Sequence, residues 1–260
     1  MAAVKAIVFD FDGTISTLRA GWEEIMRPFM YESIVGDREL SEAQEDALFQ
    51  EIDEYIDQST GIQTIYQMRW LADTVEKKGW NTPILGEWEY KAIYNDRLLE
   101  QVEVRIKNLR EGKLNAEDYL IKGAVALIRE LHSRGVEMYI ASGTDHPDVV
   151  REVEVLGIAP YITEIAGAPV GKAECSKEKV IQDLIRDKGL SGRELAVIGD
   201  GKVEIRLGKE AGGISLGLAS DEEKREGLNV VKQKRLEVAG ADWISGDFNN
   251  IDEWLARLGL

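Results

Sequence analysis

The chain has 260 residues, of which 31% are charged, and 48 acidic against 32 basic residues give a net charge of −16. This charge disfavours binding to nucleic acid or acidic membranes, and no apolar run approaches the length of a membrane span. One cysteine excludes an intrachain disulfide or a multi-cysteine metal site, and two histidines disfavour a histidine-rich one, so oxygen-ligated Mg²⁺ is the easier metal to bind.

The first predicted element is a strand over about residues 4–10. It begins without the long apolar segment of a signal peptide, so we expect a cytoplasmic protein. The apolar run Ala6 to Phe9 is typical of a strand buried on both faces of a parallel sheet. Asp10, Asp12 and Gly13 follow it, and this segment alone leaves two interpretations open. In the first interpretation, Asp12-Gly13 forms a hairpin turn. In the second, the end of the strand presents two carboxylates to a metal and a substrate.

Residues 17–119 are predicted to be almost wholly helical. One helix begins near Gly21, and another follows Ser41, whose side chain can cap it. Two more are indicated by apolar residues at helical spacing: Ile65, Met68, Ala72 and Val75, and then Leu98, Val102, Ile106 and Leu109. No partner strand follows Asp12-Gly13 directly, so the hairpin interpretation loses support, although a short flap at the root of this segment remains compatible with it.

From about residue 120 the pattern alternates between helix and strand, which indicates crossover units and a parallel sheet covered by helices. The first strand therefore belongs with these later strands, and the helical segment is an insertion. The predicted helices are 122–135, 147–157, 176–189 and 203–212, with two more near the end, and the predicted strands are 136–142, 164–168, 195–200, 214–219 and 241–245.

Polar residues follow the carboxyl ends of three predicted strands, where open parallel sheets bind their ligands. Each group alone has an ordinary explanation, such as a turn or a solvated lysine. Together they fit phosphoryl transfer, because carboxylates suit Mg²⁺ while a lysine and main-chain amides neutralise a phosphate. The groups are Asp10, Asp12 and Thr14; Ser142, Gly143 and Thr144; Asp200 and Glu204; and Lys177 on the helix before the third of these strands.

These motifs resemble those of the haloacid dehalogenase superfamily of phosphohydrolases. DFDGT at 10–14 resembles the first motif, Ser142 in ASGT the second, Lys177 in CSKEKVI the third and GDGKVE at 199–204 the fourth. The resemblance implies an α/β fold with a Rossmann-like parallel sheet, helices on both faces, and a smaller all-helical cap. It covers residues 1–16 and 120–260 as the catalytic core, and the cap would be residues 17–119, which would contact the leaving group and set specificity.

The resemblance also implies roles for single residues. Asp10 would be the nucleophile that forms an aspartyl-phosphate, and Asp12 the acid and base for the leaving group and water. Glu204 stands where an aspartate is common, and it would either meet the metal through water or pair with Lys177. The remaining roles are phosphate binding by Thr14, Ser142 and the Gly143 amide, charge balance by Lys177, and metal binding by Asp10, the Asp12 carbonyl and Asp200.

We expect from these roles a Mg²⁺-dependent phosphatase acting on a small phosphorylated metabolite, such as a sugar phosphate. Asp12 argues for phosphate esters, because dehalogenation needs no acid to protonate an alkoxide. A phosphomutase of the same fold and a non-catalytic binding or regulatory protein are the alternatives. Arg19, near the first loop, either reads a second anionic group on the substrate or is a solvated residue at the hinge of the cap.

Overall fold

The computed structural model describes residues 3–60, 62–171, 176–190 and 192–260, without the side chains of residues 176, 177, 180 and 181. The chain divides into two compact units. The core unit is Met1–Ala20 with Arg105–Leu260, and the helical unit is Gly21–Val104. A cap function for the predicted helical domain, residues 17–119, stays a prediction.

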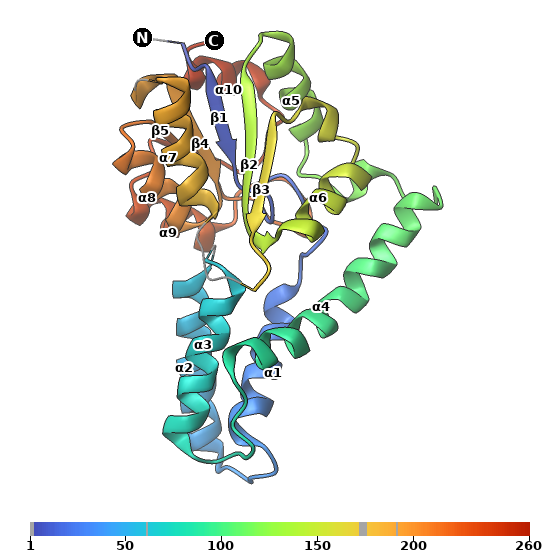
Figure 1. Cartoon of the computed structure of the whole chain (residues 1–260), viewed down its shortest axis with the longest axis vertical. Helices are drawn as coiled ribbons and strands as arrows, with labels where there is room; N and C mark the ends of the chain where they lie inside the picture. The colour runs from blue at the N-terminus through green and yellow to red at the C-terminus, as the bar shows by residue number, and fades with distance from the viewer. Residues whose placement is uncertain (1–2, 61, 172–175, 191) are drawn as a thin grey trace. The chain divides into compact units, whose positions relative to one another are not determined.

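The core unit contains a six-stranded sheet in which all neighbouring strands run parallel (Figure 1). The strand order β3-β2-β1-β4-β5-β6 places β1 between β2 and β4, and Phe9 pairs with both Ile140 and Ile198. The predicted Rossmann-like α/β fold is therefore confirmed. The strands are β1 Ala6–Phe9, β2 Glu137–Asp145, β3 Glu164–Ala168, β4 Leu195–Gly199, β5 Ile214–Leu218 and β6 Trp243–Ser245.

Helices cover both faces of this sheet because successive residues of β1 point to opposite sides. Ile7 and Phe9 belong to one apolar cluster with residues of α5, α6 and α10, whereas Ala6 and Val8 belong to another with residues of α7 and α8. Each large side chain buried in this way contributes about 1.5–3 kcal/mol. The helices are α5 Ala124–Ser133, α6 His146–Val155, α7 Ser176–Lys188, α8 Lys202–Glu210, α9 Val230–Ala239 and α10 Ile251–Leu258.

The helical unit is built from amphipathic helices, as the apolar spacing predicted. Each helix buries one apolar face, with Phe29 and Met30 on α1, Leu48 and Ile52 on α2, and Leu71 on α3. The last helix, α4, continues into the core unit. The bounds are α1 Trp22–Val35, α2 Glu42–Ser59, α3 Thr64–Lys78 and α4 Glu87–Arg110.

Two local features concern the loop after β1 and the end of β2. The loop leads into no extended hairpin strand among the described residues, in line with the support that this interpretation lost: Gly13 N donates to Ser16 O at 2.8 Å, and the isolated bridges of Ser16 to Asp12 and Leu120 remain compatible with a short flap. Gly13 has a φ of +74°, which favours glycine. Strand β2 also extends beyond residue 142, since an irregularity between Ala141 and Asp145 allows its pairing with β3 to resume.

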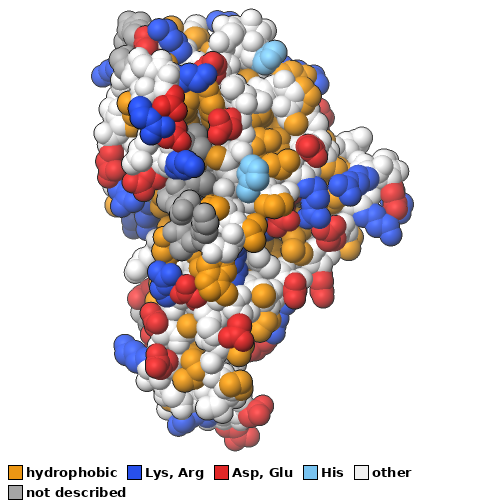
Figure 2. All heavy atoms as spheres, in the orientation of Figure 1, with side chains coloured by type: hydrophobic (Ala, Val, Ile, Leu, Met, Phe, Trp, Pro, Cys, Tyr) orange, Lys and Arg blue, Asp and Glu red, His pale blue; other side chains and the backbone are white. Residues whose placement is uncertain are grey.

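The surface is strongly charged, with acidic and basic side chains interspersed on the face shown in Figure 2. Among the described residues, no helix has the length and apolar character needed to cross a bilayer. The expectation that the chain does not bind nucleic acid stays a prediction based on its net charge of −16.

Candidate active site

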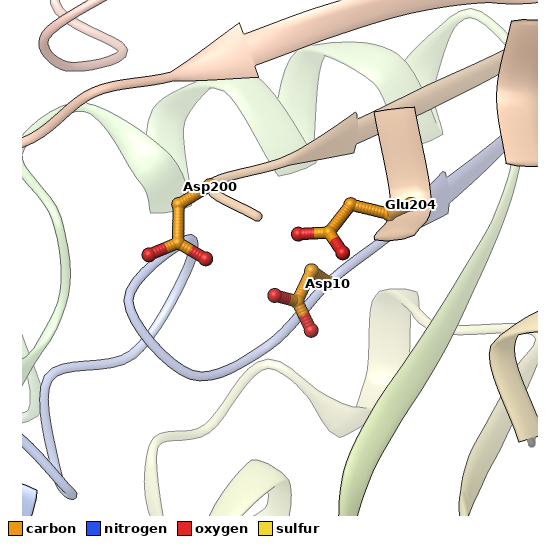
Figure 3. Close-up of side chains that lie close together, drawn as sticks. All are labelled: Asp10, Asp200 and Glu204. Carbon is orange, nitrogen blue, oxygen red and sulfur yellow. The ribbon is translucent and has the colours of Figure 1, made fainter. Parts of the chain in front are cut away.

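Three buried carboxylates gather at the carboxyl ends of β1 and β4 (Figure 3). One oxygen each of Asp10, Asp200 and Glu204 lies within 4.8 Å of the other two, and the residues are 5%, 5% and 1% exposed. Asp10 is fixed by its backbone N, which donates to Ile198 O on β4 at 2.8 Å. Parallel pairing of β1 with β4 thus places Asp10 beside Asp200, as their positions after two strands indicated.

Glu204 reaches this cluster from the first turn of α8, where its Oε1 accepts a hydrogen bond from Gly201 N at 2.5 Å. Neighbouring glycines make room for it, because an added Cβ at Gly199 would overlap the Glu204 side chain. The three side chains form an oxygen-only donor set of the kind that Mg²⁺ prefers, so these residues fit the metal expected from the sequence.

Asp12 lies beside the end of β2. Its Oδ2 accepts hydrogen bonds from Thr144 Oγ1 at 2.8 Å and from Ser142 Oγ at 3.3 Å. Thr14 is fully buried, and within the described part of the chain its Oγ1 has no hydrogen-bond partner. Gly143 lies in the same end of β2. The first two predicted motifs are therefore adjacent in the fold.

Arg19 is buried, so the alternative of a solvated arginine is wrong. Its Nη2 lies 2.7 Å from Oε1 of Glu152 and 3.6 Å from Asp148, and its Nε lies 4.0 Å from Asp12 Oδ1. Burial raises the pKa of the fully buried Glu152 to about 7, although Arg19 acts in the opposite direction. Binding of a second anionic substrate group by Arg19 stays a prediction.

Lys177, the predicted third motif, lies in α7, but its side chain is outside the described part of the structure. Its predicted pairing with the phosphate or with Glu204 therefore stays a prediction.

Lys232 on α9 also contacts the carboxylate cluster and was not predicted from the sequence. Its Nζ lies 2.7 Å from Asp200 Oδ2 and 2.6 Å from Glu222 Oε1. Burial lowers the pKa of Lys232, but the carboxylates of Asp200 and Glu222 more than offset this and hold it above its ordinary value. No local signal identifies this residue, because the run KQKR at 232–235 has the composition of a solvated helix face.

Gly13 completes the site through its lack of a side chain. A Cβ at this position would lie 2.5 Å from Asp200 Oδ2 and 3.1 Å from Glu222 Oε1. The glycine of the first motif therefore serves two needs, a positive φ for the turn and a close approach to the Asp200 carboxylate.

Comparison with known proteins identifies a family for most of the chain. A family model described as a haloacid dehalogenase-like hydrolase matches residues 4–212. A phosphoserine phosphatase from Streptococcus thermophilus is 29% identical over an alignment 140 residues long, and the match covers 49% of this chain. The match spans 63% of the length of that relative.

Solved structures with low sequence identity share the fold. A protein from Haemophilus somnus described as a predicted phosphoglycolate phosphatase has a TM-score of 0.65 at 16% identity, covering 98% of this chain and 99% of its own. A β-phosphoglucomutase from Clostridium difficile has a TM-score of 0.64 at 14% identity, covering 98% and 97%. At these identities the likeness concerns the fold alone.

Proposed function

Since this chain belongs to the haloacid dehalogenase-like hydrolases, we propose that it is a cytoplasmic, Mg²⁺-dependent phosphatase of a small phosphorylated metabolite, such as a sugar phosphate. The observation that carries this proposal is the placement of Asp10 and Asp12. Asp10 belongs to the buried carboxylate cluster, whereas Asp12 is held by hydroxyls of Ser142 and Thr144 at the end of β2. The two carboxylates that we propose as nucleophile and acid thus lie at one sheet edge.

Asp10, Asp200 and the main-chain carbonyl of Asp12 would hold the Mg²⁺, with Glu204 beside them as a direct ligand or through water. The metal would supply positive charge that offsets the phosphate and holds it in place. Three buried carboxylates within 4.8 Å of one another repel each other unless positive charge offsets theirs, which supports a cation at this place in addition to Lys232 beside Asp200.

In the first step, a carboxylate oxygen of Asp10 attacks phosphorus and the bond from phosphorus to the ester oxygen breaks. Asp12 gives its proton to that oxygen, so that the substrate leaves as an alcohol. In the second step, water attacks the phosphorus of the aspartyl-phosphate and gives a proton to Asp12. The bond between phosphorus and Asp10 then breaks, which releases inorganic phosphate and restores both carboxyl groups.

Thr14, Ser142 and the Gly143 amide would bind the phosphate oxygens in both steps. The buried Thr14 hydroxyl supports this assignment, because a buried hydroxyl without a partner among the described residues is costly unless a ligand satisfies it. Lys177 would balance the charge of Asp10 and the phosphate.

The experiment that tests this function measures phosphate release from a panel of phosphorylated metabolites, with Mg²⁺ and with excess chelator. We expect Mg²⁺-dependent release from a narrow group of phosphate esters. Isomerisation of a sugar phosphate without phosphate release would instead identify a phosphomutase, which would use the same residues. Neither product from folded protein across the panel would contradict the catalytic proposal and favour a binding protein.

A further inference from the structure

Lys232 comes from a helix that the motifs of the candidate site do not include. Helix α9 follows β5, and Lys232 reaches from its first turn to Asp200 at the end of β4. Its side chain is 12% exposed, compared with 72% for Lys224 in the preceding loop. An ammonium group buried to this extent is costly unless paired, and here two carboxylates pair with it.

The contacts form a chain that runs from Glu222 through Lys232 to Asp200. Lys232 Nζ donates to Glu222 Oε1 at 2.6 Å and to Asp200 Oδ2 at 2.7 Å. A carboxylate held through one oxygen by an ammonium has a fixed orientation and can offer its other oxygen to a cation. Gly13 leaves room beside Asp200, because a Cβ at residue 13 would lie 2.5 Å from the same Oδ2 atom.

We propose that Lys232, anchored by Glu222, is a positioning residue that orients Asp200 for Mg²⁺ binding. The proposal rests on the proposed function, because it requires that the carboxylate cluster of Asp10, Asp200 and Glu204 binds Mg²⁺. It adds two residues, one on α9 and one in the loop before it, to the groups on which the metal site depends.

If Lys232 had a different role, its removal would change the Mg²⁺ affinity in the opposite direction. If Lys232 only compensated charge, its ammonium 2.7 Å from a metal ligand would repel Mg²⁺, and its removal would strengthen Mg²⁺ binding. If it positions Asp200, its removal weakens Mg²⁺ binding, because the ligand loses its fixed orientation. Loss of residues that orient metal ligands typically costs about 10- to 100-fold in metal affinity.

The test is calorimetric titration of Mg²⁺ alone into the full-length chain after removal of bound metal with a chelator. The variants are Lys232→Met, which keeps the apolar stem, and Glu222→Gln, which weakens the anchor and leaves Lys232 in place. Lys209→Met is the matched control, because Lys209 pairs with Asp242 at the opposite edge of the sheet and its loss changes the net charge equally. Thermal unfolding in chelator verifies that each variant is folded.

We expect Mg²⁺ to bind the wild-type chain, a loss of affinity of about tenfold or more in Lys232→Met, and a smaller loss in Glu222→Gln. Lys209→Met should bind as the wild type does. Unchanged or tighter binding in Lys232→Met would overturn the positioning role while leaving the metal site intact. If Lys232→Met does not fold, unchanged affinity in Glu222→Gln would overturn it instead. Absence of Mg²⁺ binding in the wild type would overturn the metal site itself.

Discussion

The core unit and the helical unit differ in how many charged residues they bury: of the six buried charged residues among those described, five lie in the core unit and one, Lys91, lies in the helical unit. At the carboxyl edge of its sheet the core unit buries Asp10, Asp200, Glu204, Arg19 and Glu152. In the helical unit, ion pairs such as Arg27–Asp53, Arg69–Glu87 and Arg97–Glu32 have side chains that are about a quarter to a half exposed or more. Exposed pairs contribute little to stability, whereas buried charges need close partners. Burial of charge is therefore concentrated in the part of the molecule that we propose carries the chemistry.

The largest effect should come from Asp10→Asn, which removes the proposed nucleophile from the core unit. We expect turnover of phosphate esters to fall by roughly 10⁴-fold or more. The thermal midpoint should stay equal or rise, because one of three close carboxylates loses its charge. Phosphate release and thermal unfolding of the same preparation check both expectations, and full activity would refute the role of Asp10.

The next effect concerns the buried pair of Arg19 and Glu152. Arg19→Met leaves Glu152 without its partner, and we expect the free energy of unfolding to fall by about 3–5 kcal/mol. A double variant with Met at both positions should regain most of this loss, because an apolar pair needs no compensating charge. Urea titrations of the wild type, Arg19→Met and the double variant measure these free energies of unfolding. A loss below about 1 kcal/mol in Arg19→Met would contradict the expected cost of the unpaired Glu152.

The loss in free energy of unfolding caused by Arg19→Met should depend on pH, through the ionisation of Glu152. The pKa of Glu152 in the folded chain, about 7, lies above its ordinary value of 4.5, so the folded state binds this proton more tightly than the unfolded state. That contribution to stability is present below pH 4.5 and is lost as the pH rises through 7. Without Arg19, the ionised form of Glu152 is even less stable in the folded chain. The free energy of unfolding that Arg19→Met loses should therefore be larger at high pH than at low pH.

A smaller effect is expected for Gly13→Ala, which tests the close approach to Asp200. The matched control is Gly135→Ala, because Gly135 has a φ of +75° against +74° for Gly13 and no atom within 4 Å of an added Cβ. Both variants should lose about 1–3 kcal/mol of stability from backbone strain. Only Gly13→Ala should also weaken Mg²⁺ binding, and equal Mg²⁺ affinity in the two would contradict the proposed fit.

The smallest effect is expected in the helical unit. Asp53→Asn removes the charge of an exposed pair with Arg27, whose Nε lies 2.6 Å from Asp53 Oδ1. We expect a loss of less than about 1 kcal/mol and no change in Mg²⁺ affinity. A loss as large as that of Arg19→Met would remove the contrast between the two units.

Much of the fold was predictable because its signals are local. The apolar run Ala6–Phe9 indicated a strand buried on both faces, and the later alternation of helix and strand indicated a parallel sheet. Since parallel strands end at one edge, the positions of Asp10 and Asp200 were enough to predict that they lie close together. The Asp12-Gly13 turn was ambiguous, because the same dipeptide also begins hairpins.

The partners of the site residues were not predictable in the same way. Glu152 lies 133 positions from Arg19, and Lys232 lies 32 positions from Asp200. Each pair forms only when a helix packs beside a strand end, and neither Glu152 in α6 nor Lys232 in α9 differs in local pattern from a solvated residue. The extension of β2 to Asp145 likewise depends on its pairing with β3.

The measurement that tests the central claim most directly is a search for phosphate on Asp10 during turnover. Protein mixed with a substrate from the panel is quenched in acid, and its peptides are analysed by mass spectrometry. We predict a phosphoryl group on the peptide that contains Asp10, and none in Asp10→Asn. Rapid turnover with no phosphorylated Asp10, or turnover by the Asp10→Asn variant at the wild-type rate, would contradict a covalent aspartyl-phosphate mechanism.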